Sequence, residues 1–228
     1  MVGGFVSVVI PVRDGAKYLG AAIDSVLAQT SPPREVVVVD DGSLDDTPAV
    51  IAGYDDPVRG IRQQRHGNSS ALNRGIAAVR GDYVAFLDAD DLWAPEKLAL
   101  QLRVLEGDES IDAVFGLVQQ FLSDDADPLL AEKVVIPSGS QPGVIKTAML
   151  VRRRVLDGVG RFDESRSSGD FTDWYARALE WGLTSRVPEV VVARRRIHGA
   201  NLGIRHHDCQ WPETLEVLKA SLDRRRRA

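Results

Sequence analysis

RGDYVAFLDADDLWAP, residues 80–95, is the part of the chain around which the rest is organised. Its apolar run over residues 83–87 predicts a buried β-strand that ends in three carboxylates, Asp88, Asp90 and Asp91. Because side chains two positions apart point the same way in an extended segment, Asp88 and Asp90 can reach one shared point. Two oxygen donors of this kind suit a hard divalent cation such as Mg²⁺ or Mn²⁺. The alternative is a solvated turn whose acids cap the following helix.

The chain before this segment alternates between strands and helices. Residues 6–10 and 35–40 are continuous apolar, β-branched runs, which are typical of strands buried on both faces of a sheet. Between them, five apolar residues recur at the spacing of one helical face: Leu19, Ala22, Ile23, Val26 and Leu27. This alternation predicts a parallel sheet with right-handed crossovers.

The same pattern continues to Gly107. Thr47 and Pro48 are expected to be the N-cap and first residue of a short helix, and residues 58–63 an edge strand. Two further helices are predicted, one from Gly67 to Arg80-Gly81 with Leu72, Ile76 and Val79 facing the sheet, and one from Pro95 with Leu98, Leu102 and Leu105 buried.

After Gly107 the predicted strands lack regular helices between them. Strands are expected over residues 112–122, 144–152 and 187–194, a helix over 173–181 ending at Gly182, and a last helix after Pro212. Residues 123–141 carry acids, Pro and Gly and predict a long surface loop. The second half is therefore expected to extend the sheet and to add loops to its carboxyl edge.

Composition limits the class of protein. A chain of 228 residues with 44% hydrophobic and 27% charged residues fits one globular α/β domain. Neither an apolar run of about 18 residues nor a signal peptide is found, so a cytoplasmic location without a transmembrane segment is expected. The single Cys209 can form no intramolecular disulfide, and the net charge of −5 argues against nucleic acid as a partner.

Polar residues cluster where three predicted strands end. These ends are Pro11 to Asp14, Asp40 to Ser43, and Asp88 to Asp91. In an open α/β sheet, ligands bind outside the carboxyl ends of the strands. The chain has neither GxGxxG after its first strand nor GxxxxGK[ST], which removes the main support for dinucleotide and P-loop sites. A ligand met by carboxylates remains, although Asp40 could instead cap the next helix.

Four ordered motifs resemble the family 2 glycosyltransferases of the GT-A fold. They are VSVVIPVRDGAKYLGAAIDSVLAQT, EVVVVDDGSLDDT, HGNSSALNRGIAAVRGDYVAFLDADDLWAP and GVGRFDE, and the match covers most of residues 5–200. The resemblance implies an α/β fold with a Rossmann-like, mostly parallel sheet, helices on both faces and a C-terminal extension of strands, loops and a helix. It also implies one domain over residues 1–228, with a nucleotide-binding half (1–107) and an acceptor-binding half (108–228).

The resemblance assigns donor-binding roles. The residues that would hold the nucleotide base are Pro11, Val12, Arg13, Asp14, Asp40, Asp41 and Gly42. Asp40 would accept from the uracil imide if the donor is a UDP-sugar. Those near the nucleotide and the donor sugar would be Gly67, Ala71, Asn73, Asp88 and Ala89. The metal ligands would be Asp90, Asp88 and His198, holding Mn²⁺ or Mg²⁺. One arginine of residues 194–196 either pairs with the diphosphate or belongs to a solvated strand end.

The general base is where this chain departs from the family. An inverting transferase needs a carboxylate to take the proton of the acceptor hydroxyl. In relatives this carboxylate belongs to a motif like GEDxDLWLR. Here the corresponding residues 169–177 are GDFTDWYAR, so Phe171 stands where the usual base would be. Asp170 and Asp173 flank the gap, and Asp173 is preferred by a small margin. Asp173 could be only a helix N-cap, and Asp170 only a loop acid.

The leading hypothesis is a metal-dependent inverting glycosyltransferase that moves a sugar from a nucleotide-diphosphate donor to an acceptor hydroxyl of a small molecule, peptide or saccharide. The alternatives are a sugar-phosphate nucleotidyltransferase and a nucleotide-sugar-binding protein that has lost catalysis, the latter because of Phe171. Trp93 and Trp211 could stack on an acceptor, whereas Trp174 and Trp181 are expected to pack against helices. A homodimer is left open, and the sequence does not reveal the donor sugar or the acceptor.

Overall fold

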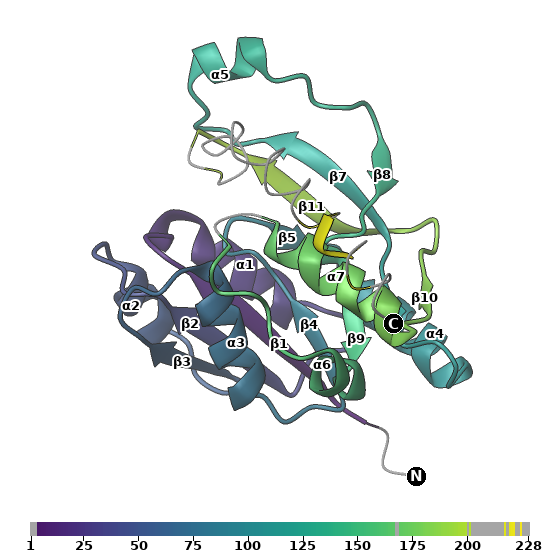
Figure 1. The fold of residues 1–228 in the computed structure, drawn as a ribbon. Coiled ribbons are helices and arrows are strands. Elements are labelled where there is room, and N and C mark those ends of the chain that lie inside the picture. Colours follow the sequence, from purple (N-terminus) through teal and green to yellow (C-terminus); the bar gives the residue numbers. More distant parts are fainter. Residues whose placement is uncertain are drawn as a thin grey trace.

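The computed structural model describes residues 4–166, 169–199, 201, 217, 219–221 and 224. Two sheets organise this part of the chain (Figure 1). The seven-stranded sheet has the order β10 (Ser185–Arg186), β6 (Ala113–Val114), β9 (Leu150–Arg152), β4 (Tyr83–Phe86), β1 (Val6–Val12), β2 (Glu35–Asp40), β3 (Val58–Arg62). The four-stranded sheet has the order β5 (Leu92–Trp93), β11 (Val191–Ile197), β7 (Leu117–Leu122), β8 (Ser140–Pro142).

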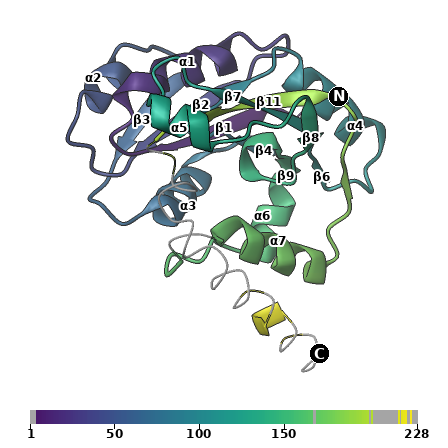
Figure 2. The same ribbon diagram turned by 90° about the horizontal axis from the view of Figure 1, so that it is seen from above.

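Helices cover both faces of the larger sheet (Figure 2). They are α1 (Ala16–Leu27), α2 (Thr47–Ala52), α3 (Asn68–Ala78), α4 (Lys97–Gly107), α6 (Arg153–Val159) and α7 (Asp170–Trp181), with α5 (Pro128–Lys133) and the 3-10 helix η1 (Lys146–Ala148) elsewhere. Val8 and Val38 pack in one core with α1 and α4, while Val9 and Val37 pack in the other with α3, α6 and α7. The apolar runs of β1 and β2 thus supply both cores, as expected for a buried parallel strand.

The first half follows the sequence prediction closely. Strands β1, β2, β3 and β4 are parallel neighbours, with β3 at the edge and β4 in the interior of the sheet. The predicted cap of α2 was wrong, because Thr47 is its first helical residue and the N-cap is Asp46. The Asp45 carboxylate accepts hydrogen bonds from both the amide and the hydroxyl of Thr47. The Thr47 hydroxyl, which we expected to cap the helix, is therefore bound to Asp45 instead. Helix α4 begins at Lys97 rather than Pro95, and the short strand β5 was missed.

The second half differs from the prediction in its strands. The expected strand over residues 112–122 is divided at Gly116 between β6 in the larger sheet and β7 in the smaller one. Of residues 144–152, only β9 is a strand, preceded by η1 and followed by α6, a helix that the prediction missed. The second half therefore extends the larger sheet by three strands and also builds most of a separate sheet.

An excursion connects β7 to β8, and we call residues 123–139 the arm. The sequence predicted only a loop here, but the arm contains α5. Its base is attached to α1, because the Tyr18 hydroxyl donates to Asp125 Oδ1 over 3.0 Å and the Lys17 ammonium contacts Asp125 Oδ2. The arm is thus linked to the first half of the chain.

Some expectations concern the C-terminal part of the chain. Cys209 and Trp211 lie outside the described residues, as does most of the last helix expected after Pro212. Within the described residues, no helix is both long and apolar enough to cross a bilayer.

Candidate functional site

The carboxyl ends of β1 and β2 are tied together by Asp14. Its amide donates to Ser43 Oγ over 2.9 Å, and its Oδ1 accepts from the Leu44 amide over 2.8 Å. Asp14 itself has a φ of 49°, in the left-handed region. Pro11 and Val12 lie buried in β1, whereas Arg13 and Asp14 are exposed at its end. The first two predicted strand ends therefore form one edge.

Asp40 carries a buried oxygen without a hydrogen bond. Its side chain ends β2 and the residue is 2% exposed. Oδ1 accepts from the Ser43 amide over 2.8 Å, but Oδ2 has no hydrogen-bond donor among the described residues, and Arg62 Nε is 3.6 Å away. Asp40 does not cap α2, whose N-cap is Asp46, so that alternative is wrong. A buried acceptor of this kind is costly unless a ligand supplies a donor.

Asp41 and Gly42 shape the loop that leads to α3. The Asp41 carboxylate accepts 2.8 Å hydrogen bonds from the amides of His66 and Gly67 and from the Gln63 carboxamide. Gly42 has a φ of 72°, and a Cβ there would lie 3.1 Å from the Arg65 amide nitrogen. Asp41 is thus occupied by the protein itself, and it places Gly67 beside the end of β2.

Asn73 and Ala71 of α3 are committed to packing. The Asn73 side chain donates to the Phe162 carbonyl and accepts from the Phe162 amide, both over 2.9 Å. Ala71 is fully buried. These contacts join α3 to the segment before α7, and a role of either residue toward the donor stays a prediction.

Asp90, His198 and Asn201 form a cluster that we call the Asp90 corner. His198 Nε2 lies 3.0 Å from Asp90 Oδ2, although the two residues are 108 positions apart. The Asn201 carboxamide donates to the same Asp90 oxygen over 2.9 Å, and its Oδ1 accepts from the His198 amide over 2.6 Å. The sequence singled out Asp90 and His198 but gave Asn201 no role.

Arg196 holds this corner in place. Its amide donates to Asp91 Oδ1 over 2.9 Å and its Nε to the Asp90 carbonyl over 3.1 Å. The guanidinium lies 4.8 Å from the ring centroid of Tyr18, and that ring lies 4.7 Å from the ring of His198. Asp91 is 2% exposed, and burial, followed by the charges of Asp88 and Asp90, raises its pKa well above the ordinary value. Asp91 therefore joins strands rather than facing a ligand.

The Asp90 corner fits a metal that is partly held by substrate. Among the described residues, no group of three or more His, Cys, Asp or Glu side chains could hold a metal ion by itself. Mg²⁺ in nucleotide sites is commonly bound by one or two carboxylates together with substrate phosphates and water. Asp90 supplies one such carboxylate, and the His198 imidazole beside it is a nitrogen donor, which transition-metal ions accept more readily than Mg²⁺ does. Whether Asp88 joins them as a third ligand, as the sequence suggested, stays a prediction.

Asp88 lies among charges from three parts of the chain. Its amide donates to Thr147 Oγ1 over 3.2 Å. Burial raises the pKa of its carboxyl, the charges of Lys146 and Arg195 lower it, and those of Asp90 and Asp170 raise it, with a net rise. Lys146 and Thr147 belong to η1 and were missed, since the apolar run of residues 144–152 suggested a strand. The available signal was a lone lysine within that run.

Asp170 begins α7 on the side of Asp88. Its Oδ2 accepts from Lys146 Nζ over 2.8 Å and from Ser69 Oγ over 3.4 Å. Burial raises the pKa of the Asp170 carboxyl, but the Lys146 charge and hydrogen bonds from Lys146, the Phe171 amide and Ser69 outweigh it, so the pKa is lowered overall. Asp170 is consequently a carboxylate at neutral pH.

Asp173 has a structural partner. It is 5% exposed, and its Oδ2 accepts from Arg177 Nε over 2.9 Å. Arg177 also donates to the carbonyls of Val159 and Arg161, which attaches α7 to the preceding segment. The N-cap of α7 is Gly169, so the interpretation of Asp173 as an N-cap was wrong. These contacts do not support the preference for Asp173 over Asp170.

Two aromatic residues that the sequence singled out, Phe171 and Trp93, pack within the protein. Phe171 lies in a ring cluster with Phe115, Trp174 and Tyr175. Trp93 is 4% exposed and donates from Nε1 to the Thr147 carbonyl over 2.9 Å. The expectation that Trp93 stacks on an acceptor is therefore wrong, because its ring is inside the core.

Comparison with known sequences identifies the family. Residues 7–159 match the family described as glycosyl transferase family 2. The chain belongs to this family. An uncharacterized glycosyltransferase of Nostoc sp. is 36% identical over 216 residues, covering 86% of this chain and 66% of the relative. Chondroitin synthase of Escherichia coli is 29% identical over 228 residues, covering 96% and 33%. The chain thus spans less than two thirds of the length of these relatives.

Solved glycosyltransferase structures share the fold. S. aureus TarS in complex with UDP-GlcNAc has a TM-score of 0.70 at 20% identity, covering 86% of this chain and 60% of that one. The mannosyltransferase PcManGT from Pyrobaculum calidifontis, with GDP-Man and Mn²⁺, has a TM-score of 0.69 at 21% identity, covering 89% and 60%. The predicted GT-A fold is confirmed. At these identities the likeness concerns the fold alone.

Proposed function

We propose that this family 2 chain transfers a sugar, with inversion, from a UDP-sugar to an acceptor hydroxyl in a metal-dependent reaction. The observation that carries the proposal is the 3.0 Å contact between Asp90 and His198 at the carboxyl edge of the sheet. An acid and an imidazole from distant parts of the chain meet where open α/β sheets bind ligands.

The Asp40 oxygen that accepts no hydrogen bond suits a base with a ring N–H, such as the uracil of a UDP-sugar. A uracil imide presents one N–H, which Asp40 Oδ2 would accept, and that hydrogen bond would remove the cost of the buried orphan oxygen. Residues 11–14 and Gly42 surround the same edge and would enclose the base. TarS has been solved with UDP and UDP-GlcNAc, and PcManGT with GDP-Man, so the family fold accepts more than one base.

Asp90 and His198 would hold Mn²⁺ or Mg²⁺, with Asp88 nearby as a further ligand or as a partner of the ribose. When bound, the ion supplies positive charge that offsets the diphosphate, which the surrounding acids would otherwise repel. Asn201 and Arg196 would keep Asp90 and His198 oriented toward it, as outer-shell hydrogen bonds commonly do.

For the general base we propose Asp170 rather than Asp173. Asp170 acts electrostatically on Asp88, and its lowered pKa keeps it ionised, so its oxygens are free of protons, although the lowering also makes it a weaker base. Lys146, paired with it, would hold its carboxylate in position. Both carboxylates have a basic partner, but Asp173 pairs with Arg177 of its own helix, whereas Asp170 pairs with Lys146 of η1, beside the Thr147 hydroxyl that accepts from the Asp88 amide.

One observation favours a second function, a nucleotide-sugar-binding protein without catalysis. Phe171, at the position where relatives have the base, is part of an aromatic cluster rather than the site. The family match leaves the nucleotidyltransferase alternative without support.

A thermal-shift screen of UDP-, GDP- and other nucleotide sugars, with and without Mn²⁺, tests the proposal, followed by product analysis over an acceptor panel. We expect UDP-sugars to raise the melting temperature only with the metal, since ligands that bind the folded state stabilise it. Asp90→Asn should remove this dependence and the turnover. Full activity of the wild type in chelator would contradict the metal assignment, and binding without transfer or donor hydrolysis would favour the second function.

A further inference from the structure

Consecutive arginines of β11 point to opposite faces of the four-stranded sheet. Arg194 and Arg196 lie over the Phe121 ring, at 4.7 Å and 4.8 Å. Arg195 instead pairs in register with Gln120, so these two side chains share the other face. The Asp90 corner belongs with the Arg196 face, because Tyr18 contacts both Arg196 and His198. Arg195 therefore lies on the opposite face of β11 from His198, although its charge reaches Asp88.

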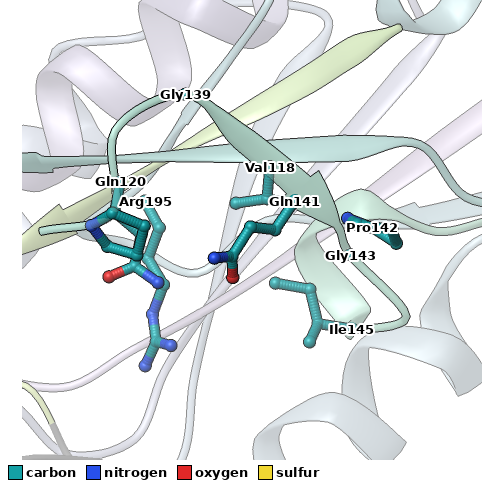
Figure 3. A pocket seen from close by; sticks show the side chains of 9 residues that line it. Val118, Gln120, Gly139, Gln141, Pro142, Gly143, Ile145 and Arg195 are labelled. Atoms are coloured by element: carbon teal, nitrogen blue, oxygen red, sulfur yellow. The ribbon is translucent and has the colours of Figure 1, made fainter. Parts of the chain in front are cut away.

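A small cavity lies on the Arg195 face (Figure 3). Its volume is about 110 Å³, and the residues that line it are Val118, Gln120, Pro137, Gly139, Gln141, Pro142, Gly143, Ile145 and Arg195. The register explains this set, since Val118 pairs with Gln141 and lies two positions from Gln120. Figure 3 shows the carboxamides of Gln120 and Gln141 and the Arg195 guanidinium on the same side of the β7–β8 pair.

Arg195 has no committed partner within the described part of the chain. Unlike the Arg196 side chain, the Arg195 side chain makes no hydrogen bond or ion pair with the described residues. Its positive charge acts on the carboxyls of Asp88 and Asp91, where it partly opposes the rise in pKa that burial causes. Arg195 thus lines the cavity and also influences Asp88, and its guanidinium N–H groups donate to no other described residue. A guanidinium in this state suits a planar or tetrahedral anion, which it can bind through two hydrogen bonds.

The size of the cavity limits what enters. One water occupies about 30 Å³ of the liquid, so the space corresponds to roughly four waters. This is room for a carboxylate or phosphate group, and the rest of a larger molecule could extend through the open side of the cavity, where Gly139, Gln141 and Pro142 are exposed. The carboxamides of Gln120 and Gln141 can donate to such a group. Val118 and Ile145 add apolar surface to the same cavity.

We propose that this cavity, the Arg195 pocket, binds an anionic substituent of the acceptor, a carboxylate or a phosphate. The proposal rests on the transfer function above. Ile145 lines the pocket, and the next residue, Lys146, pairs with the candidate base Asp170. An acceptor anchored by its anion at Arg195 therefore presents a neighbouring hydroxyl toward Asp170 and Asp88, where the proton is taken.

Matched acceptors test the pocket. With the donor found in the screen, kcat/KM is measured for phenyl glucuronide against phenyl glucoside, and for glucose 6-phosphate against glucose. We expect the wild type to prefer at least one anionic member by about tenfold or more, which equals about 1.4 kcal/mol. Arg195→Gln should reduce that preference to about twofold while leaving the donor KM unchanged. Arg194→Gln, on the opposite face, is the matched control and should keep the preference.

Two results would overturn the proposal. One is a wild type that does not distinguish the anionic from the neutral acceptors. The other is an Arg195→Gln variant with a raised donor KM and an unchanged acceptor preference, which would place Arg195 at the donor diphosphate.

A binding measurement separates this proposal from the transfer function. Saturation-transfer NMR with phenyl glucuronide and phenyl glucoside, on protein saturated with UDP and Mn²⁺ and on the free protein, requires no turnover. Stronger binding of the glucuronide that is lost in Arg195→Gln supports the pocket even if no sugar is transferred. Equal binding of the two compounds contradicts the pocket even if transfer to another acceptor is found.

Discussion

Asp170 and Asp173 are three positions apart in α7, yet the first faces the candidate site and the second holds the helix in place. Asp170 interacts with Lys146 and acts on Asp88, while Asp173 anchors α7 through Arg177. Asp170→Asn should therefore lower kcat by about 10²- to 10⁴-fold with little change in stability. Asp173→Asn should cost about 2 kcal/mol of unfolding free energy, because a buried charge loses its partner. Steady-state kinetics and urea denaturation of both variants measure this; a reversed pattern would return the base to Asp173.

Lys146 controls the protonation of Asp170. Because the Lys146 charge lowers the pKa of the Asp170 carboxyl and burial opposes it, Lys146→Met should raise that pKa. The sign for stability follows: a carboxylate with a lowered folded pKa stabilises the fold above its unfolded pKa, and this contribution is lost as pH falls through the folded value. The variant should lose it at higher pH than the wild type. Carboxyl ¹³C NMR titration measures the shift, Lys146→Arg is the control that keeps the charge, and an unmoved titration of Lys146→Met would refute the coupling.

At the scale of elements, Tyr18 connects α1 to both the arm and the Asp90 corner. Tyr18→Phe removes the hydroxyl that donates to Asp125 but keeps the ring beside His198. We expect a loss of about 1 kcal/mol or less in global stability and faster protease cleavage within α5. Limited proteolysis with mass spectrometry detects the cleavage. UDP and Mn²⁺ binding should be unchanged, whereas Tyr18→Leu should weaken it. An arm cleaved at the wild-type rate would show that the hydroxyl does not fasten it.

The elements of the first half were predictable because their apolar periodicity is local. The helical spacing of Leu19, Ile23 and Val26 predicts α1, and the β-branched run of residues 35–40 predicts β2. The second half depends on long-range pairing instead. Nothing in residues 112–122 marks that Ala113 pairs with β9 while Leu117 pairs with β8 and β11. The lone lysine within residues 144–152 did not reveal that Lys146 would meet Asp170.

The site could be predicted only as far as motifs and alternation allowed. Asp40 ends β2 and Asp90 lies in the turn between β4 and β5, and the sequence motifs pointed to both. Asn201 was given no role, and Arg195 was not told apart from Arg194 and Arg196, because their contacts depend on the register of β11 against β7 and on the turn after it. The division into halves at residue 107, the homodimer and the cytoplasmic location stay predictions.

For the whole molecule, Gly116 is the point where the chain passes from one sheet to the other. A Cβ at this position would lie 2.5 Å from Val192 Cγ1 and 3.0 Å from the Val190 carbonyl oxygen. Gly116→Ala should therefore force β7 and β11 apart and cost about 1 to 3 kcal/mol. Urea denaturation measures the loss, and Gly107→Ala is a suitable control, because a Cβ there meets no atom within 4 Å. Equal stability of the two variants would show that the crossing is not tight.

The pairing of β5 with β11 has a consequence for the order of assembly. Trp93 lies opposite Ala193, and this register alone brings Asp90, before β5, to His198, after β11. A slip of one residue would move the imidazole by about 3.3 Å along the strand and turn it to the other face. The proposed metal site thus cannot exist in a partly folded chain whose larger sheet alone is complete. Mn²⁺ binding during refolding would therefore report when β5 pairs with β11. We expect it to occur after Trp174 is buried in the core of the larger sheet.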